Sequence, residues 1–232
     1  MAKPSKHDPS KPQVESYDYK KAFYRSTAVA DDYDQHRFTT PARIRRNERK
    51  WRAIGKALAQ APEVKRVLDL PCGTGRFTGR LASSGYEVIG SDISLEMIGK
   101  AVTAGGAAGP AVLGYVQANG EKLPFRNAAV DCVVSIRFMF HVDPDVRIRI
   151  LREFGRVARR QVVDYRHRYS MRYRKWQALR ALGLTREPLE RVSRERLEHE
   201  FTSAGLTIRA IVPVSRGWFS DKWVVLSERT AG

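Results

Sequence analysis

Residues 67–77 constrain the fold of this chain more than any other stretch. They read Val-Leu-Asp-Leu-Pro-Cys-Gly-Thr-Gly-Arg-Phe, an apolar run that ends in a turn with two glycines and continues into a helix-like pattern. Glycines allow a tight turn and a close approach of the backbone to a ligand, and the first turn of a helix offers unpaired N–H groups. This layout is typical of a nucleotide-type cofactor site.

Expected strands and helices alternate along the rest of the chain. Apolar runs predict strands over residues 66–70, 86–90, 111–116, 130–136, 161–165, 206–214 and 218–226. Amphipathic spacing predicts helices over residues 41–61, 75–84, 94–103, 143–159, 171–182 and 193–204. We therefore expect an α/β fold with a Rossmann-like, seven-stranded, mostly parallel sheet and helices on both faces. The short turn at residues 215–217 predicts a terminal antiparallel hairpin.

The length of 232 residues fits one domain of ordinary size. We expect residues 1–15, which are interrupted by prolines, to form a disordered tail, and residues 16–232 to form the single domain. Within it, residues 16–62 are expected to be a helical N-terminal lid, and residues 166–192 a basic insert or cap.

The chain is strongly basic, with 42 Lys and Arg against 25 Asp and Glu, a net charge of +17. Such a charge favours anionic partners, although an Arg-rich composition throughout its source cell would produce the same excess. Cys72 and Cys132 are the only cysteines, so no disulfide framework is expected. The polar amino terminus and the lack of a long apolar run predict a cytoplasmic protein without a transmembrane segment. Peripheral membrane contact stays open, and the oligomeric state is not predicted.

Acidic and polar residues follow the next two expected strands. Asp92 ends the second strand, where a carboxylate can accept hydrogen bonds from the two hydroxyls of a ribose. The alternative is that Asp92 caps the helix beginning at Ser94. Asn119 and Glu121 follow the third strand, where a crevice at the sheet edge would meet an adenine ring.

Together these blocks resemble a class I S-adenosylmethionine-dependent methyltransferase of the type 11 kind. That family reads Leu-Asp-Leu-Gly-Cys-Gly-Thr-Gly where this chain has Leu-Asp-Leu-Pro-Cys-Gly-Thr-Gly at residues 68–75. The family's Gly-Asp-Ala-Glu-x-Leu-Pro-Phe corresponds to residues 118–125, and its Phe-Asp-x-Val to residues 130–133. The resemblance covers residues 67–142 by motif. It implies methyl transfer from S-adenosylmethionine.

The resemblance also implies a set of cofactor-binding residues. Asp69 and the backbone of Cys72 and Gly73 would hold the methionine part, Asp92 the ribose, and Ile93 and Met97 would pack against adenine. The whole implied set is Asp69, Pro71, Cys72, Gly73, Thr74, Gly75, Asp92, Ile93, Met97, Asn119, Gly120, Glu121 and Ser135. No metal is implied.

Two members of this set depart from the family pattern. Pro71 replaces a glycine, which fixes φ near −65° and removes an N–H donor. Asn119 replaces an acidic residue, but its side-chain carbonyl can still accept a hydrogen bond from the adenine amine.

Three residues are candidates for the methyl-transfer site. Residues 29–34 are similar to the family's lid segment, so Tyr33 would line the site, or else pack under a surface helix. His141 and His167 follow the fourth and fifth strands, where an open α/β sheet places its ligands, and either could remove a proton from the acceptor. A histidine at either position is more often structural or on the surface than a base.

The acceptor is expected to be an anionic small molecule, saccharide or lipid-linked compound, methylated at oxygen or nitrogen. Arg137, Tyr165 and Arg168 are the candidate acceptor-binding residues, since arginines bind phosphates and carboxylates and aromatic rings stack on rings. The basic segment could instead bind RNA, or be the solvated face of a helix. A regulator or scaffold that binds the cofactor without turnover is a third alternative.

Overall fold

The computed structural model describes residues 40–105, 111–185, 191–216 and 219–230. The strands of this part form one sheet in the order β3-β2-β1-β4-β5-β7-β6. All neighbouring pairs are parallel except those that β7 makes with β5 and β6. The strands are β1 (Arg66–Asp69), β2 (Glu87–Asp92), β3 (Val112–Gln117), β4 (Val130–Ser135), β5 (Ala158–Arg166), β6 (Leu206–Pro213) and β7 (Lys222–Arg229).

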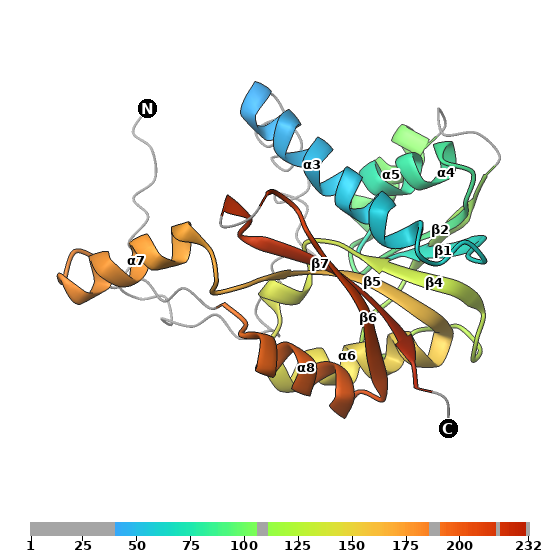
Figure 1. Ribbon diagram of the computed structural model, residues 1–232. Helices are drawn as coiled ribbons and strands as arrows, with labels where there is room; N and C mark the ends of the chain where they lie inside the picture. The colour runs from blue at the N-terminus through green and yellow to red at the C-terminus, as the bar shows by residue number, and fades with distance from the viewer. Residues whose placement is uncertain (1–39, 106–110, 186–190, 217–218, 231–232) are drawn as a thin grey trace, which may run out of the picture.

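Helices cover both faces of the sheet, as Figure 1 shows. One face carries α3 (Pro41–Leu58), α4 (Arg76–Ser83) and α5 (Leu95–Gly105). The other face carries α6 (Pro144–Val157) and α8 (Arg194–Ser203), while α7 (Met171–Ala181) stands away from the body. A single 3-10 turn, η1 (Met139–His141), follows β4. The predicted α/β class with a mostly parallel seven-stranded sheet is confirmed.

The central strands are apolar on both faces because both faces are covered. In β1, Val67 packs into the core under α3 and α4, and Leu68 packs into the core under α6 and α8. Successive side chains of a strand point to opposite faces, so each strand supplies both cores. Phe154 and Phe201 are the largest fully buried side chains on the α6 and α8 side.

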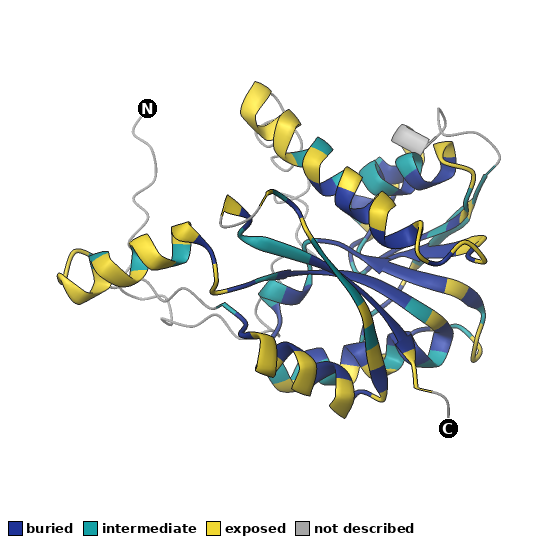
Figure 2. Cartoon of the chain, viewed as in Figure 1, coloured by how far each residue is buried: buried dark blue, intermediate teal, exposed yellow. Residues whose placement is uncertain are grey.

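Helix α3 begins at Pro41, as the sequence predicts, and ends at Leu58, three residues before the expected boundary. Its second half buries Ile54 and Leu58 against the sheet, whereas its first turns are exposed (Figure 2). The expected tail at residues 1–15 and most of the expected lid at residues 16–62 lie outside the described residues. The described part of that segment, α3, packs on the sheet against β5, β6 and β7.

The last two strands form the expected hairpin, with two differences. β7 begins at Lys222, four residues later than predicted, because residues 219–221 belong to the connection from β6. β7 also inserts between β5 and β6, so only β7 is antiparallel to the rest, and β6 runs parallel to β1–β5. β5 likewise begins three residues earlier than predicted, since Ala158 already pairs with Val130.

The expected basic segment at residues 166–192 contains α7, close to the predicted helix at residues 171–182. Ser170 caps it by accepting a hydrogen bond from the Tyr173 N–H at 3.3 Å. α7 buries none of its residues (Figure 2), so packing against the sheet does not hold it in place. Among the described helices, none is long and apolar enough to cross a membrane.

A buried polar network ties α6 to α8 and to β5. The Arg147 guanidinium donates to both carboxylate oxygens of Glu200, at 2.7 and 3.0 Å. The Tyr165 hydroxyl donates to the same carboxylate at 3.0 Å. All three side chains are buried, so their hydrogen bonds to one another replace those that they would make to water in the unfolded chain. Such a network is costly to break, because the partner that remains is left buried and charged.

We expect Glu200→Gln to lower the free energy of unfolding by about 3–5 kcal/mol, since it leaves Arg147 charged and buried. The matched control is Glu198→Gln, also in α8, because Glu198 pairs with Arg194 on the exposed surface. It should cost less than about 1 kcal/mol. Urea unfolding of the three proteins measures both values, and similar losses in the two variants would contradict the prediction.

Candidate functional site

The turn after β1 is bonded directly to the end of β2. The Leu70–Pro71 peptide is cis, and the next two N–H groups point toward β2. The Cys72 N–H donates to the Ser91 carbonyl at 2.8 Å, and the Gly73 N–H donates to Asp92 Oδ2 at 2.9 Å. Pro71 is therefore accommodated in a turn that places the sequence-predicted residues Cys72, Gly73 and Asp92 together.

Glycine is required at two points of this turn. Gly73 and Gly75 have φ angles of +54° and +81°, which side-chain-bearing residues rarely adopt. A Cβ on Gly75 would also come within 3.1 Å of Ala101 in α5. The turn thus leads directly into α4 and lets α4 approach α5 closely. Thr74, between the two glycines, is buried.

Asp92 is a buried carboxylate at the end of β2. Its Oδ1 accepts from the Ser94 N–H at 3.1 Å, while Oδ2 holds the Gly73 N–H. Burial raises the pKa of Asp92, and these backbone donors partly oppose that effect. The cap of α5 is Ser94, whose Oγ accepts from the Met97 N–H at 3.2 Å. Asp92 therefore links the turn to the start of α5, and each of its oxygens keeps a lone pair for a further donor.

Asp69, at the end of β1, lies under this turn. The Thr78 hydroxyl donates to Asp69 Oδ2 at 2.6 Å. Burial, with a smaller contribution from the nearby Asp92, raises the pKa of Asp69 to about 7. Burial also raises the pKa of the neighbouring Cys72 thiol, which stays protonated near neutral pH.

The loop after β3 closes over the same turn. Asn119 Oδ1 accepts from the Glu121 N–H at 3.1 Å, which leaves that oxygen one lone pair. A Cβ on Gly120 would lie 3.4 Å from both Leu70 and Phe138, so the Gly120 backbone packs against the turn. Glu121 itself pairs with Arg149 of α6 at 2.9 Å.

The remaining predicted cofactor residues surround this turn. Met97 is buried in α5 and Ile93 is half-buried just after β2. Ser135 is buried at the end of β4, and its hydroxyl has no hydrogen-bond partner in the described part of the chain. The sequence therefore predicted a set of residues that the fold does bring to one edge of the sheet.

A second group of charges lies beside this edge, at the ends of β4 and β5. The Arg137 N–H donates to Asp164 Oδ1 at 2.5 Å, and Arg137 has a φ of +67°. Asp164 Oδ2 forms a buried ion pair with Lys50 Nζ of α3 at 2.8 Å. Burial alone would raise the pKa of Asp164, but Lys50 and Lys222 hold it below its usual value. Burial, followed by repulsion from Lys50, lowers the pKa of Lys222 to about 7.

Sequence reasoning missed Lys50 and Lys222. Both are lysines in otherwise ordinary patterns, on elements far from Asp164 in the chain. Only the insertion of β7 beside β5 and the packing of α3 over both strands bring them together. A buried position on the inner side of α3 was the available signal for Lys50.

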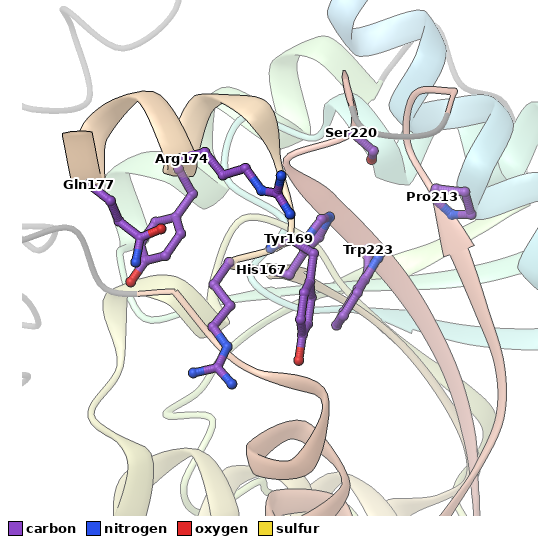
Figure 3. A pocket seen from close by; sticks show the side chains of 9 residues that line it. His167, Tyr169, Arg174, Gln177, Pro213, Ser220 and Trp223 are labelled. Carbon is purple, nitrogen blue, oxygen red and sulfur yellow. Dashed lines mark hydrogen bonds between the residues drawn. The ribbon is translucent and has the colours of Figure 1, made fainter. Parts of the chain in front are cut away.

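A pocket of about 540 Å³ opens next to the carboxyl end of β5 (Figure 3). The His167 ring stacks on Trp223 of β7 at 4.1 Å between centroids, and Tyr169 stacks beside them, 5.7 Å from Trp223. Figure 3 shows these three rings side by side, with Arg174 and Gln177 of α7 on the other wall. The lining residues are His167, Arg168, Tyr169, Tyr173, Arg174, Gln177, Pro213, Ser220 and Trp223.

The surroundings of His167 keep its ring neutral, with the proton on Nε2. Its Nδ1 accepts from the Tyr169 N–H at 3.1 Å. Burial, only partly offset by Asp221, lowers the pKa of His167 to about 4. The ring is therefore neutral near pH 7 with its proton on Nε2, a buried atom that has no hydrogen-bond partner among the described residues.

The other candidate residues have different surroundings. Arg168 lines the pocket, as a substrate-binding role requires. Tyr165 does not line it: alternation along β5 turns its ring into the α6 and α8 core, with its hydroxyl on Glu200. His141 is half-buried in η1, with its ring 4.5 Å from Phe140. Tyr33 lies outside the described residues.

Comparisons with known proteins agree with this geometry. A family model described as a methyltransferase domain matches residues 67–161. The demethylmenaquinone methyltransferase of Clavibacter sepedonicus is 33% identical over 117 residues, 48% of this chain and 46% of that protein. The O-methyltransferase resE of Aspergillus sclerotiorum is 32% identical over 114 residues, 48% of this chain and 42% of that protein. The chain thus spans less than half the length of these relatives.

Solved structures match over most of both chains, and one of them illustrates the likeness. Magnesium protoporphyrin IX methyltransferase from Synechocystis PCC 6803, with bound S-adenosylhomocysteine, superposes with a TM-score of 0.71 at 15% identity. The match covers 91% of this chain and 98% of that one. The sheet order, the glycine turn after β1 and the acid after β2 define a class I methyltransferase fold. Residues 67–161 thus match a methyltransferase domain, and the fold around them is that of the class I S-adenosylmethionine-dependent methyltransferases.

Asp69→Asn should change how stability depends on pH. In the unfolded chain Asp69 loses its proton near pH 4, whereas in the folded protein it keeps it until about pH 7. The folded state therefore binds more protons between these values, so Asp69 lowers the free energy of unfolding as pH rises from 4 to 7. The full effect is about 4 kcal/mol at 1.4 kcal/mol per pKa unit.

The measurement is urea unfolding of the cofactor-free wild type and variant between pH 4 and 8. The amide oxygen that the substitution introduces can still accept from Thr78, so the variant should match the wild type near pH 4 and be the more stable protein at pH 8. Parallel curves for the two proteins would show that Asp69 is ionised throughout.

Proposed function

We propose that this protein transfers a methyl group from S-adenosylmethionine to an anionic acceptor bound in the pocket beside β5. The acceptor is a small molecule, a saccharide or a lipid-linked compound, methylated at oxygen or nitrogen. The observation that carries the proposal is the position of the pocket. It lies at the carboxyl end of β5, the same sheet edge as the turn after β1, where open α/β sheets bind ligands.

The residues at that edge fit S-adenosylmethionine. Asp92 is fixed by two backbone donors and keeps lone pairs for the ribose hydroxyls. Asn119 keeps a lone pair on Oδ1 for the adenine amine, and Gly120 leaves no side chain between the loop and the turn. Asp69 and the turn backbone are the residues for the methionine part. In the ionised form, Asp69 would attract the ammonium of that group.

The pocket fits a ring-bearing, negatively charged acceptor. Its volume of about 540 Å³ suits a drug-sized molecule. The stacked rings of His167, Tyr169 and Trp223 offer an aromatic wall, and Arg168 and Arg174 add positive charge. Two similar proteins are named for the acceptors demethylmenaquinone and magnesium protoporphyrin IX, and a third for methyl transfer to oxygen.

When bound, S-adenosylmethionine supplies an activated methyl group, which forms a bond to the acceptor oxygen or nitrogen as the carbon–sulfur bond breaks and sulfur keeps the electron pair. The protein's task is then to align the acceptor and to take up its proton. We assign the uptake of the acceptor's proton to His141, in the turn after β4. His167 is the weaker candidate, because its Nδ1 already accepts from a backbone N–H and its Nε2 carries a proton. Its ring is better suited to form part of the aromatic wall against which the acceptor packs.

RNA is a second candidate acceptor, favoured by one observation on α7. Tyr173 and Trp176 stack there at 5.4 Å, and the Arg180 guanidinium lies 5.3 Å from the Trp176 ring. Aromatic rings interleaved with arginines on an exposed helix can stack bases and contact phosphates. This helix borders the pocket through Tyr173 and Arg174.

Methyl-labelled S-adenosylmethionine tests the proposal. The protein is incubated with the cofactor and a cell extract divided into untreated, nuclease-treated and lipid-extracted portions. We expect the label to survive nuclease treatment. Label that lipid extraction removes from the extract would indicate a lipid-linked acceptor. Loss of label with nuclease would favour RNA instead. Absence of label despite cofactor binding would favour a regulator or scaffold.

Asp92→Ala serves as the cofactor control in the same experiment. It removes the carboxylate that we assign to the ribose, so we expect cofactor affinity to fall at least ten-fold, as measured by calorimetry, and labelling to fall with it. Unchanged affinity would show that Asp92 has only the structural role of joining the turn to α5.

The two histidines give opposite expectations. His141→Gln should lower kcat for a hydroxyl acceptor by about 10²–10⁴-fold with little change in cofactor affinity, because proton removal is lost. His167→Gln removes a ring from the aromatic wall of the pocket and should mainly raise KM for the acceptor. Rate measurements near pH 7 and pH 9 check this: at high pH the acceptor loses its proton more readily, so the His141→Gln defect should shrink. Equal kcat losses in both variants at both pH values would contradict the assignment.

A further inference from the structure

We propose that Arg166 and Arg191 form a binding site for a phosphate group, and that this phosphate belongs to the acceptor. The second part rests on the proposed function, whereas the phosphate site itself does not. The site lies beside the large pocket, on the segment that connects β5 to α8.

Backbone pairing holds the two arginines side by side. The Val192 N–H donates to the Arg166 carbonyl at 3.0 Å, and the Arg168 N–H donates to the Val192 carbonyl at 3.2 Å. His167 and Val192 thus form a parallel bridge. In this register Arg166 lies opposite Arg191, so the two side chains leave the backbone on the same side. The positions of both positive charges are therefore set before any ligand binds.

Three nitrogens of the two guanidiniums lack a partner within the described part of the protein. Arg166 Nε and Arg191 Nε and Nη1 are buried, and none has a hydrogen-bond partner within the described ranges. Buried donors of a charged group without partners are costly and uncommon in native proteins. Burial, and then repulsion from Arg166, lowers the pKa of Arg191 to about 10, which is the expected response of an uncompensated cation.

The acids nearby are already engaged by other cations. Asp164 is paired with Lys50, and Glu200 with Arg147 and, at 3.6 Å, Arg196. Asp221 attracts both arginines but lies closest to Arg172, at 3.9 Å. Lys222, with Nζ 5.5 Å from the Phe140 ring, adds a positive charge when it is protonated. A ligand with two negative charges would balance the positive charges of Arg166 and Arg191 that these acids do not neutralise. A phosphate monoester carries close to two negative charges near neutral pH.

The shape of the site agrees with a small group. A cavity of about 20 Å³ separates the arginines from the core, lined by Phe140, Arg147, Tyr165, Arg166, Arg191, Val192 and Arg196. The cavity has room for about one water-sized atom. It therefore suits a phosphoryl oxygen that enters between the guanidinium groups of Arg166 and Arg191. The Arg166 guanidinium carbon lies 3.9 Å from the centre of the Phe140 ring, and the Phe140 ring is 4.5 Å from that of His141. A phosphate here would fix an acceptor next to the proposed base.

Phenyl phosphate and benzoate are the probes that test the site, with binding to the full chain measured by calorimetry without turnover. We expect the wild type to bind phenyl phosphate, and benzoate more weakly, since benzoate carries one charge. Arg191→Gln should weaken phenyl phosphate binding at least ten-fold, because it removes one fork. Arg194→Ala is the matched control, three residues along the chain, with its guanidinium paired to Glu198 on the surface. It should bind phenyl phosphate as the wild type does.

Thermal unfolding in phosphate-free buffer separates loss of the site from loss of folding. Arg191→Gln removes one of two adjacent, partly buried cations, so the variant should unfold at the same temperature as the wild type or higher. Phenyl phosphate should raise the unfolding temperature of the wild type but not of the variant.

Three results would overturn the proposal. These are no phenyl phosphate binding by the wild type, equal weakening in Arg191→Gln and Arg194→Ala, or benzoate binding as tight as phenyl phosphate. S-adenosylhomocysteine binding, measured on the same samples, keeps the two proposals apart. If it is intact while phenyl phosphate does not bind, only the phosphate site fails. If phenyl phosphate binds but no acceptor becomes labelled in the extract, the proposed function fails instead.

Discussion

The cofactor edge of this protein depends on one buried carboxylate. Asp92 receives an N–H from the turn after β1 and another from the start of α5, and so fixes two loops that have no strand pairing of their own. Hydrogen bonds from backbone donors to a charged acceptor are stronger than those between neutral groups, and burial excludes the water that would compete for them. The glycines of the turn and the close contact of Gly75 with α5 follow from this arrangement. The site is therefore rigid where the cofactor class requires a fixed shape.

Much of this edge could be predicted from the sequence because its residues are close in the chain and their types are restrictive. The turn needs glycines at positive φ, and the strand ends need small or acidic residues; both leave a visible pattern. Pro71 departs from the family pattern, and the turn accommodates it while still directing the N–H groups of Cys72 and Gly73 toward β2. The seven strands were predictable for a similar reason, since apolar runs covered on both faces are hard to mistake.

The acceptor side was less predictable because its residues meet only through distant pairing. Trp223 reaches His167 because β7 inserts beside β5, and Lys50 reaches Asp164 because α3 crosses that face of the sheet. Nothing local in the sequence indicates either contact. Tyr165 shows the same limit on a smaller scale: a shift of one residue along β5 decides whether a ring faces the pocket or the core. The sequence shows how many arginines the chain has, but it does not show which of them lack a hydrogen-bond partner in the fold.

The insertion of β7 between β5 and β6 also sets an order in time. β7 follows every other strand of the sheet in the sequence, yet it supplies Trp223 to the pocket and Lys222 to the charges beside it. During synthesis β6 leaves the ribosome before β7, yet β6 joins the sheet only through β7, and a domain generally folds as a unit. The acceptor pocket and the far edge of the sheet therefore both await the last strand of the chain.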